Sequence, residues 1–307
     1  MILSNDIIDI ISSFIIKKKK VLNNEFINEI NDYDKIDWKL LSLNKNAIHF
    51  LNKPENLHKI DWDNLSFNSN AIELLSMNKD KINWNNLSFN KNAISILSMN
   101  ENINKINWNN LSFNKNAISL LSMNENFNKI DWDNLSFNKN AISILEKNPD
   151  KINWYNLSLN ENAIELLYEN KNKINWTTLS LNKNAIDLLN KPENYHKIDW
   201  DYLSLNKNAI SILEKNPDKI NWNYLSLNQN AIQLLLSDEN PKKINWDTLH
   251  SNKNCFQIFI LNEYRNKFNI NKFNFINKNL FINDNENDYK EKINIVSKCI
   301  QIHLNKI

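Results

Sequence analysis

The stretch KIDWDNLSFNKNAISILEKNPD, residues 129–150, recurs in close variants along most of this 307-residue chain. Each copy contains one Trp, and successive Trp residues are 22 or 24 positions apart. A period of about 20–50 residues is typical of repeat architectures, in which each unit buries its apolar face against its neighbours. We therefore expect one array of ten repeats anchored by all the Trp residues of the chain: Trp38, Trp62, Trp84, Trp108, Trp132, Trp154, Trp176, Trp200, Trp222 and Trp246.

The frame around each Trp is strict. Counted from Trp as position 0, Lys stands at −3, Ile at −2, Asp or Asn at −1, Leu at +3, and Asn at +6 and +8 in every copy. Nine copies have Ser at +4 and Ala at +9, and the tenth has His250 and Cys255 there. The two extra residues of the long copies follow the Ala, in the connection that also holds all five Pro. This connection is predicted to be a surface turn that tolerates insertion.

The apolar spacing predicts two helices per repeat. The first, of α or 3-10 type, is capped by the Asp or Asn at −1, with Trp and Leu on one face. The second, longer α-helix is expected to begin at the Asn at +6 and to carry apolar residues at +9, +10, +12 and +13. It is expected to end at an Asn at +16 in left-handed conformation, because the chain has no Gly for that place.

Trp, the Leu at +3, the Leu or Phe at +5 and the Ala helix are expected to form the core. The Ala would lie where neighbouring helices approach most closely. A β-solenoid is the alternative, because Ile, Phe and Asn-rich turns suit strands. The apolar run lacks strict alternation and Ala is poor in strands, so the sequence favours an all-α solenoid.

Three segments follow from the repeat boundaries. Residues 35–261 form the ten-repeat solenoid, residues 1–34 an N-terminal helical cap, and residues 262–307 a C-terminal cap with a helix expected over 288–305. The N-terminal stretch L-S-N-D-I-I-D-I-I-S-S-F-I is also similar to the opening of an F-box, the adaptor element that docks onto ubiquitin-ligase scaffolds. Its usual Pro is replaced by Ser4.

The repeat frame K-I-[DN]-W-x-x-L-S-x-N-x-N-A-I-x-x-L resembles the short Trp/Asn repeats in multicopy proteins of giant DNA viruses of amoebae. The resemblance covers residues 35 to about 260. Position +7, often Pro in that family, is Lys, Ser, Glu or Gln here. The repeat length is also similar to that of leucine-rich-repeat variant solenoids. The resemblance implies a fold and a location in the cytoplasm of an infected host cell, but no activity.

The composition offers little for catalysis. A chain without Gly cannot form a phosphate-cradling loop, and its five His form no pair at metal-ligand spacing. The Asp-Trp-Asp triplets, as at 131–133, are interpreted as helix caps rather than paired catalytic carboxylates. We therefore expect no enzyme, no cofactor and no metal site.

Charge and hydropathy point to a reducing, intracellular compartment. The net charge of +2 is too balanced for a nucleic-acid or membrane-surface protein. Two Cys are too few for a disulfide framework. The apolar N-terminal run is interrupted by Asp6 and Asp9, so we expect neither a signal peptide nor a membrane span.

The polar ladders and the variable positions are the functional candidates. The Lys at −3 is expected to reach carbonyl groups at the end of the preceding helix, or else to track a phosphate backbone. The Asn ladders are interpreted as caps and inter-repeat hydrogen bonds, with ligand binding as the alternative. Positions +1, +2, +11 and +14 vary between copies. The candidate partner surface there consists of Tyr155, Tyr168, Tyr202, Glu214 and Tyr224.

The predicted function is a non-catalytic scaffold that binds a protein partner. An F-box-like ubiquitin-ligase adaptor and an anion or nucleic-acid binder that uses the Lys ladder are the two alternatives.

Overall fold

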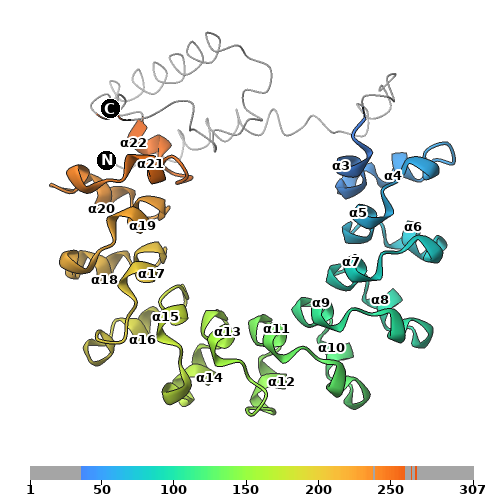
Figure 1. Ribbon diagram of the computed structural model, residues 1–307, viewed down its shortest axis with the longest axis horizontal. Helices are drawn as coiled ribbons and strands as arrows, with labels where there is room; N and C mark the ends of the chain where they lie inside the picture. The colour runs from blue at the N-terminus through green and yellow to red at the C-terminus, as the bar shows by residue number, and fades with distance from the viewer. Residues whose placement is uncertain (1–35, 238, 260–263, 265–266, 268–307) are drawn as a thin grey trace, which may run out of the picture. The chain divides into compact units, whose positions relative to one another are not determined.

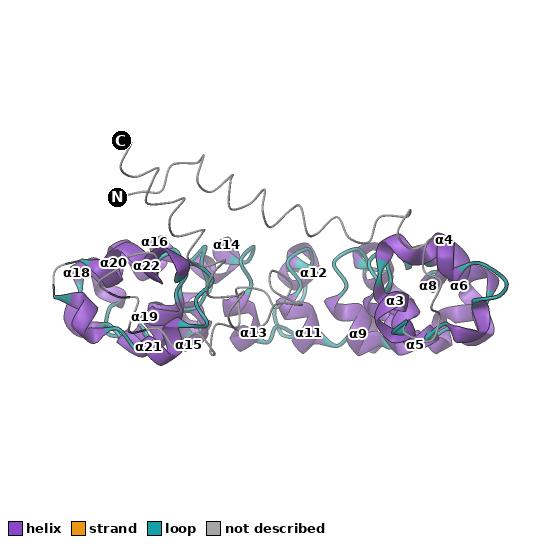
Figure 2. Ribbon diagram, turned by 90° about the horizontal axis from the view of Figure 1, so that it is seen from above, coloured by secondary structure: helices purple, strands orange, loops and turns teal. Residues whose placement is uncertain are grey.

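The computed structural model describes residues 36–237, 239–259, 264 and 267 (Figure 1). Within this range the chain divides into two compact units, residues 36–188 and the described residues from 189 onward. The predicted N-terminal cap, with its F-box-like motif, and the helix expected over 288–305 lie outside the described residues. Helices, turns and loops make up both units, and no strand occurs in the described ranges (Figure 2). The all-α solenoid is confirmed and the β alternative is wrong.

Each repeat contributes two helices of similar length. One helix starts at the Trp, and the other starts at position +10, which is Ile in nine copies and Phe256 in the tenth. The Trp-led helices are α3 (Trp38–Leu43), α5 (Trp62–Phe67), α7 (Trp84–Phe89), α9 (Trp108–Phe113), α11 (Trp132–Phe137), α13 (Trp154–Leu159), α15 (Trp176–Leu179), α17 (Trp200–Leu205), α19 (Trp222–Leu227) and α21 (Trp246–Leu249). The second helices are α4 (Ile48–Leu51), α6 (Ile72–Met77), α8 (Ile94–Leu97), α10 (Ile118–Leu121), α12 (Ile142–Glu146), α14 (Ile164–Glu169), α16 (Ile186–Leu189), α18 (Ile210–Lys215), α20 (Ile232–Leu236) and α22 (Phe256–Phe259).

Short 3-10 helices occupy most of the connections. They are η3 (Lys45–Ala47), η4 (Leu57–Lys59), η5 (Lys79–Lys81), η6 (Asn100–Lys105), η7 (Asn124–Lys129), η8 (Lys171–Lys173), η9 (Pro192–Asn194), η10 (Pro217–Lys219) and η11 (Asn240–Lys243). Eight of the nine lie between the second helix of one repeat and the Trp of the next, where the sequence predicts a surface turn, and only η3 lies within a repeat.

The predicted cap of the Trp-led helix is confirmed. Asp131 has extended backbone, and its Oδ1 accepts a hydrogen bond from the backbone N–H of Asn134 at 2.9 Å. An Asp or Asn at −1 caps every Trp-led helix in the same way. The helix is α rather than 3-10: the N–H of Leu135 donates to the carbonyl of Asp131, four residues earlier, at 2.9 Å.

The start of the second helix differs from the prediction. Asn138 ends α11 with extended backbone, and its Oδ1 accepts from the N–H of Asn140 at 3.1 Å. This local side-chain bond closes a turn that competes with a helix start. Helix α12 begins only at Ile142, after Ala141, so the predicted start at Asn138 is wrong and the second helix is not the longer one.

The predicted left-handed stop is also wrong. Asn78 has φ −127° and ψ 53°, and Asn170 and Asn216 likewise have negative φ. Backbone and side chain close the helix together: the N–H of Asn148 donates to the carbonyl of Leu145 at 2.9 Å, and its Nδ2 donates to the carbonyl of Ile144 at 2.8 Å. An Asn side chain thus satisfies a carbonyl that a Gly cap would satisfy through its backbone N–H.

The core is made of a few fixed positions. The Leu at +3, the Ala at +9 and the Leu at +13 are fully buried in the copies around Trp62, Trp84, Trp108 and Trp132. The Trp rings themselves are half-buried, so they cover the core rather than fill it. Inter-repeat packing is most extensive between consecutive Trp-led helices, not at the Ala helices as predicted.

Position +5 does not belong to the core as predicted. Phe67, Phe89, Phe113 and Phe137 are each between 37% and 42% exposed. Position +5 shares a helix face with the polar position +1, while Trp, +3 and +4 point toward the neighbours. The Phe side chains therefore lie on the solvent-exposed face of the Trp-led helices.

None of the helices within the described ranges combines the length and the apolar character needed to cross a bilayer.

Candidate interaction surfaces

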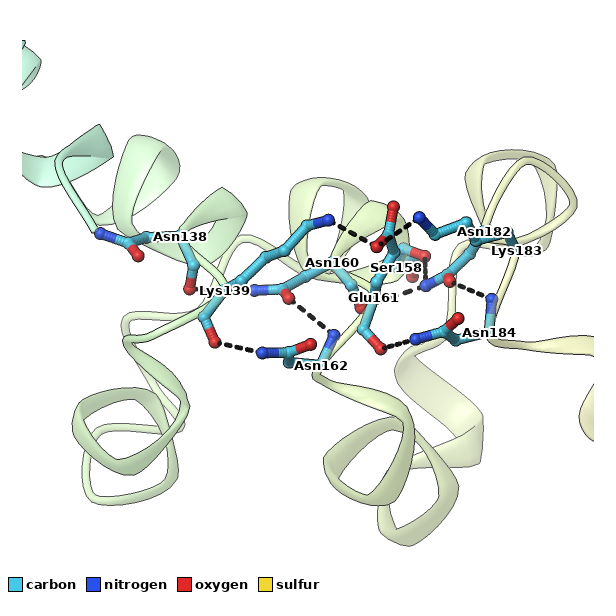
Figure 3. Close-up of polar contacts among 9 residues, drawn as sticks. All are labelled: Asn138, Lys139, Ser158, Asn160, Glu161, Asn162, Asn182, Lys183 and Asn184. Carbon is cyan, nitrogen blue, oxygen red and sulfur yellow. Dashed lines mark hydrogen bonds and ion pairs between the residues drawn. The ribbon is translucent and has the colours of Figure 1, made fainter. Parts of the chain in front are cut away.

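Within each of the two units, a buried hydrogen-bond ladder joins a repeat to the one before it. Asn138 Nδ2 donates to the carbonyls of Ser112 and Asn114, at 2.9 and 3.2 Å. Asn140 Nδ2 donates to the carbonyl of Lys115 at 3.0 Å. The Asn at +6 is buried in every copy except the first, and the Asn at +8 is exposed in every copy except the tenth. Figure 3 shows the next steps of this ladder around Asn160 and Asn182. The predicted inter-repeat bonds of the Asn residues are confirmed, whereas Asn138 ends the Trp-led helix instead of starting the second one.

The fixed Ser at +4 was not given a role by the sequence. Ser112 Oγ donates to the carbonyl of Trp108 at 2.8 Å and accepts from the N–H of Asp131, in the next repeat, at 3.1 Å. The recurrence of this Ser next to the fixed Leu at +3 was the sequence feature that could have indicated a structural role. In the tenth copy His250 replaces this Ser, and its Nδ1 contacts the carbonyl of Trp246.

The Lys ladder at −3 has an aromatic partner. Lys105 Nζ lies 4.9 Å from the ring centroid of Trp84, the Trp of the preceding repeat. The same contact recurs at 4.7–5.2 Å in four further copies, those of Lys59, Lys129, Lys173 and Lys243. A cation over an indole face is attracted by the ring quadrupole. The predicted structural role is found, with the Trp ring in place of the predicted carbonyl groups.

Exposed Phe side chains form a continuous row along the Trp-led helices. The ring centroids of Phe67 and Phe89 are 6.2 Å apart, those of Phe89 and Phe113 are 6.2 Å apart, and those of Phe113 and Phe137 are 6.3 Å apart. The first two pairs are stacked with interplanar angles of 27° and 28°. We call these four residues the Phe row. Sequence reasoning missed it as a surface by assigning position +5 to the core.

The predicted partner residues are distributed over both units. In the unit of residues 36–188, Tyr155 on α13 is 54% exposed and Tyr168 on α14 is 47% exposed, and these helices belong to different rows. In the other unit, Tyr202 is exposed and Tyr224 is half-buried. Both occupy position +2 of the neighbouring helices α17 and α19, whereas the exposed Glu214 lies on α18.

Position +7 carries an ion-pair network in the middle of the chain. Glu161 lies between Lys139 and Lys183 of the adjacent repeats, and both ammonium groups contact its carboxylate (Figure 3). Desolvation by itself would raise the pKa of Glu161, but the bonds from both Lys residues outweigh it and the pKa lies below its usual value. The network joins three consecutive repeats on the surface.

The Asp-Trp-Asp carboxylates have structural partners. Asp61 caps α5 through the N–H of Asn64 at 2.8 Å, and Asp63 Oδ1 accepts from Asn83 Nδ2, in the next repeat, at 2.7 Å. Within the described ranges, no group of three or more His, Cys, Asp or Glu residues could hold a metal ion. Burial raises the pKa of Cys255 to about 12, which keeps its thiol protonated.

Comparison with family models, curated proteins and solved structures gives no match to this chain. Its role is therefore inferred from its own surface. The fixed Asn and Ser side chains are engaged between repeats, whereas the Phe row and the exposed Tyr side chains project from the scaffold.

Proposed function

We propose that this chain is a non-catalytic repeat scaffold that binds a protein partner. The observation that supports the proposal is the ordered display of exposed aromatic side chains on a frame whose polar groups are internally bonded. Tyr and Phe are enriched in the centres of protein interfaces, where they bury large areas at small entropic cost. A continuous exposed apolar row is also unusual for a surface that faces only water.

The resemblance of the repeat frame leads to a proposal about the origin of the partner. We infer kinship with the Trp/Asn repeat proteins of giant DNA viruses of amoebae, and hence a partner from the host cytoplasm. The frame of ten Trp-led helices at 22- or 24-residue intervals supports this.

The two alternatives have less support. The F-box-like motif lies in residues 1–34, outside the described residues. Anion binding by the Lys ladder is disfavoured because five of these Lys lie over Trp rings and Asp and Glu residues are interspersed along the repeats.

Site-specific photo-crosslinking tests the proposal. The full chain is prepared with benzoylphenylalanine in place of Phe113, Tyr155 or Tyr202, and as a control in place of Ser143, an exposed residue of α12. Each version is irradiated in an amoebal lysate. We expect discrete protein adducts from at least one aromatic position and none from Ser143. Adducts from no position, or the same adducts from all four, would contradict protein binding by these surfaces.

A further inference from the structure

We propose that the Phe row binds an extended, acidic peptide segment with apolar side chains at every second position. This inference rests on the proposed function and specifies the class of partner and the surface that it uses. Three features of the row carry it: its continuity, its spacing and the charge along its borders.

The Phe row is a continuous apolar strip rather than a set of scattered side chains. Its rings come from four consecutive helices, α5, α7, α9 and α11, and each ring lies 6.2–6.3 Å from the next. The same position carries Leu43 before the row and Leu159 after it, the first 42% exposed and the second half-buried. Single exposed apolar residues are ordinary, but an ordered strip across several repeats offers area for a partner.

The spacing of the rings fits an extended chain. Alternate residues of a strand point to the same side and are about 6.4–6.8 Å apart. An extended peptide could therefore place one apolar side chain against each Phe ring. Over three steps, the positions of its side chains would shift by about 1 Å relative to the rings. A helix advances about 5.4 Å per turn and would drift by roughly twice as much over the same distance. The periodicity of the row thus selects an extended segment over a helical one.

The borders of the row determine the charge of the segment. Position +7, two residues beyond each ring, is Lys91 and Lys115 in the central repeats, and both side chains are exposed. Neither pairs with a carboxylate of the described residues. On the other border, position +1 carries the neutral Asn85 and Asn109. A peptide on the row keeps its charges within about one Debye length, 8–10 Å, of the Lys side chains, which favours carboxylates.

Single-stranded nucleic acid is the competing ligand, because aromatic rows beside Lys residues also stack bases. The flanking repeats argue against it. Position +5 is Leu43 and Leu159 in those copies, and neither offers a ring on which a base could stack. A peptide is therefore the better fit.

The test measures binding of defined probes to the full chain by fluorescence anisotropy. One labelled eight-residue peptide alternates Leu and Glu, and a second has the same composition with Leu at helical spacing. The disruptive variant is Phe89→Ser with Phe113→Ser. Its matched control is Met99→Ser with Met123→Ser, whose side chains are 39% and 44% exposed in the same two repeats but follow the second helices. Thermal unfolding of both variants establishes that they fold like the parent chain.

The alternating peptide is expected to bind at least about tenfold more tightly than the helical arrangement, and the Phe variant to lose at least about tenfold. The Met variant should stay within about twofold of the parent chain. Lys91→Glu with Lys115→Glu should weaken the Leu–Glu peptide and strengthen a Leu–Lys one.

Equal binding of the two peptides, equal losses in the two variants, or tight binding of an oligothymidylate through the Phe row would overturn the inference. If neither peptide binds while photo-adducts with a protein still form at Tyr155 or Tyr202, the inference about the Phe row is refuted but the proposed function is not. Failure of both experiments would remove the proposed function as well.

Discussion

Replacing Asn138 by Ala is expected to destabilise its part of the solenoid by about 2–5 kcal/mol. Asn138 is 2% exposed and makes three hydrogen bonds through one side chain. Two of them run to the preceding repeat, so the substitution removes contacts within the repeat and between repeats together.

The size of this loss in stability depends on which carbonyl groups are left without a hydrogen bond when the Asn138 side chain is removed. The carbonyl of Ser112 loses the hydrogen bond at 2.9 Å that Asn138 supplies, and burying an unpaired carbonyl costs about 1–3 kcal/mol. The carbonyl of Asn114 loses a weaker bond at 3.2 Å but keeps the N–H of Ala117 at 3.1 Å, so its share is about 0.5–1 kcal/mol. Loss of the turn bond to Asn140 adds a similar amount, about 0.5–1 kcal/mol.

Asn140→Ala is the matched control. Asn140 also donates to the preceding repeat, at 3.0 Å to the carbonyl of Lys115, but it is exposed and water can replace its bond. We expect a cost of about 0.5–1 kcal/mol. Asn138→Asp should cost at least as much as Asn138→Ala at neutral pH, because a carboxylate cannot donate to Ser112.

Hydrogen exchange followed by mass spectrometry is the assay. Repeat arrays unfold as coupled local units, so one global midpoint would dilute a local effect, whereas exchange reports the opening of residues 108–145 by themselves. The reasoning fails if the opening free energies of Asn138→Ala and Asn140→Ala agree within about 0.5 kcal/mol, which is the usual error of such comparisons. It fails equally if the loss in Asn138→Ala spreads evenly over repeats far from the substitution.

Three further substitutions test other contacts, each measured as the opening free energy of its own repeat by hydrogen exchange. Glu161→Gln should lower stability by less than about 1 kcal/mol at pH 7. The difference should start to shrink as the pH falls below the usual Glu pKa of about 4.3, and should vanish once the pH is below the lowered pKa of Glu161 in the folded chain. Ala141→Leu should cost about 2–3 kcal/mol by overpacking a fully buried site, whereas Ala141→Cys should be milder, since the tenth copy has a buried Cys there. Lys129→Ala should cost about 0.5–1 kcal/mol through loss of the contact with Trp108, and Lys129→Arg should restore most of it.

The repeat period, the helical class and the N-terminal caps of the Trp-led helices could be predicted from the sequence, because they depend on local chemistry. An Asp or Asn before a Trp at fixed spacing caps a helix wherever it occurs, as Asp131 does. The role of the Asn at +6 was harder to predict, because an Asn side chain can start a helix, end a helix or bond to a neighbouring repeat. Asn138 ends α11, closes a turn and reaches the preceding repeat at once, and only the stacked structure reveals all three roles.

The Phe row shows where apolar patterning misleads. Each Phe at +5 follows a buried Leu and Ser by one or two residues, so its apolar character suggested the core. Its exposure depends on where the neighbouring repeat packs, and that packing runs through the Trp-led helices at +3 and +4. The residues at +1, one turn earlier on the same helix face, are mostly polar, and this could have indicated that the face is exposed. Likewise, no sequence pattern placed the Lys at −3 over the Trp of the repeat before it.

In both the short and the long connection, one Asn side chain bonds to the same helix carbonyl, although the Asn stands at different positions. In short copies the Asn at +16 donates to the carbonyl at +12, as Asn148 does to Ile144 at 2.8 Å. In long copies the donor stands two residues later, at +18, and reaches the same carbonyl: Asn102 donates to Ile96 at 2.9 Å. The helix end is therefore satisfied in both forms, and the inserted residues are accommodated in the 3-10 turn before the next Trp. Connection length can change while the stacking of the Trp-led helices and the display of the Phe row stay the same.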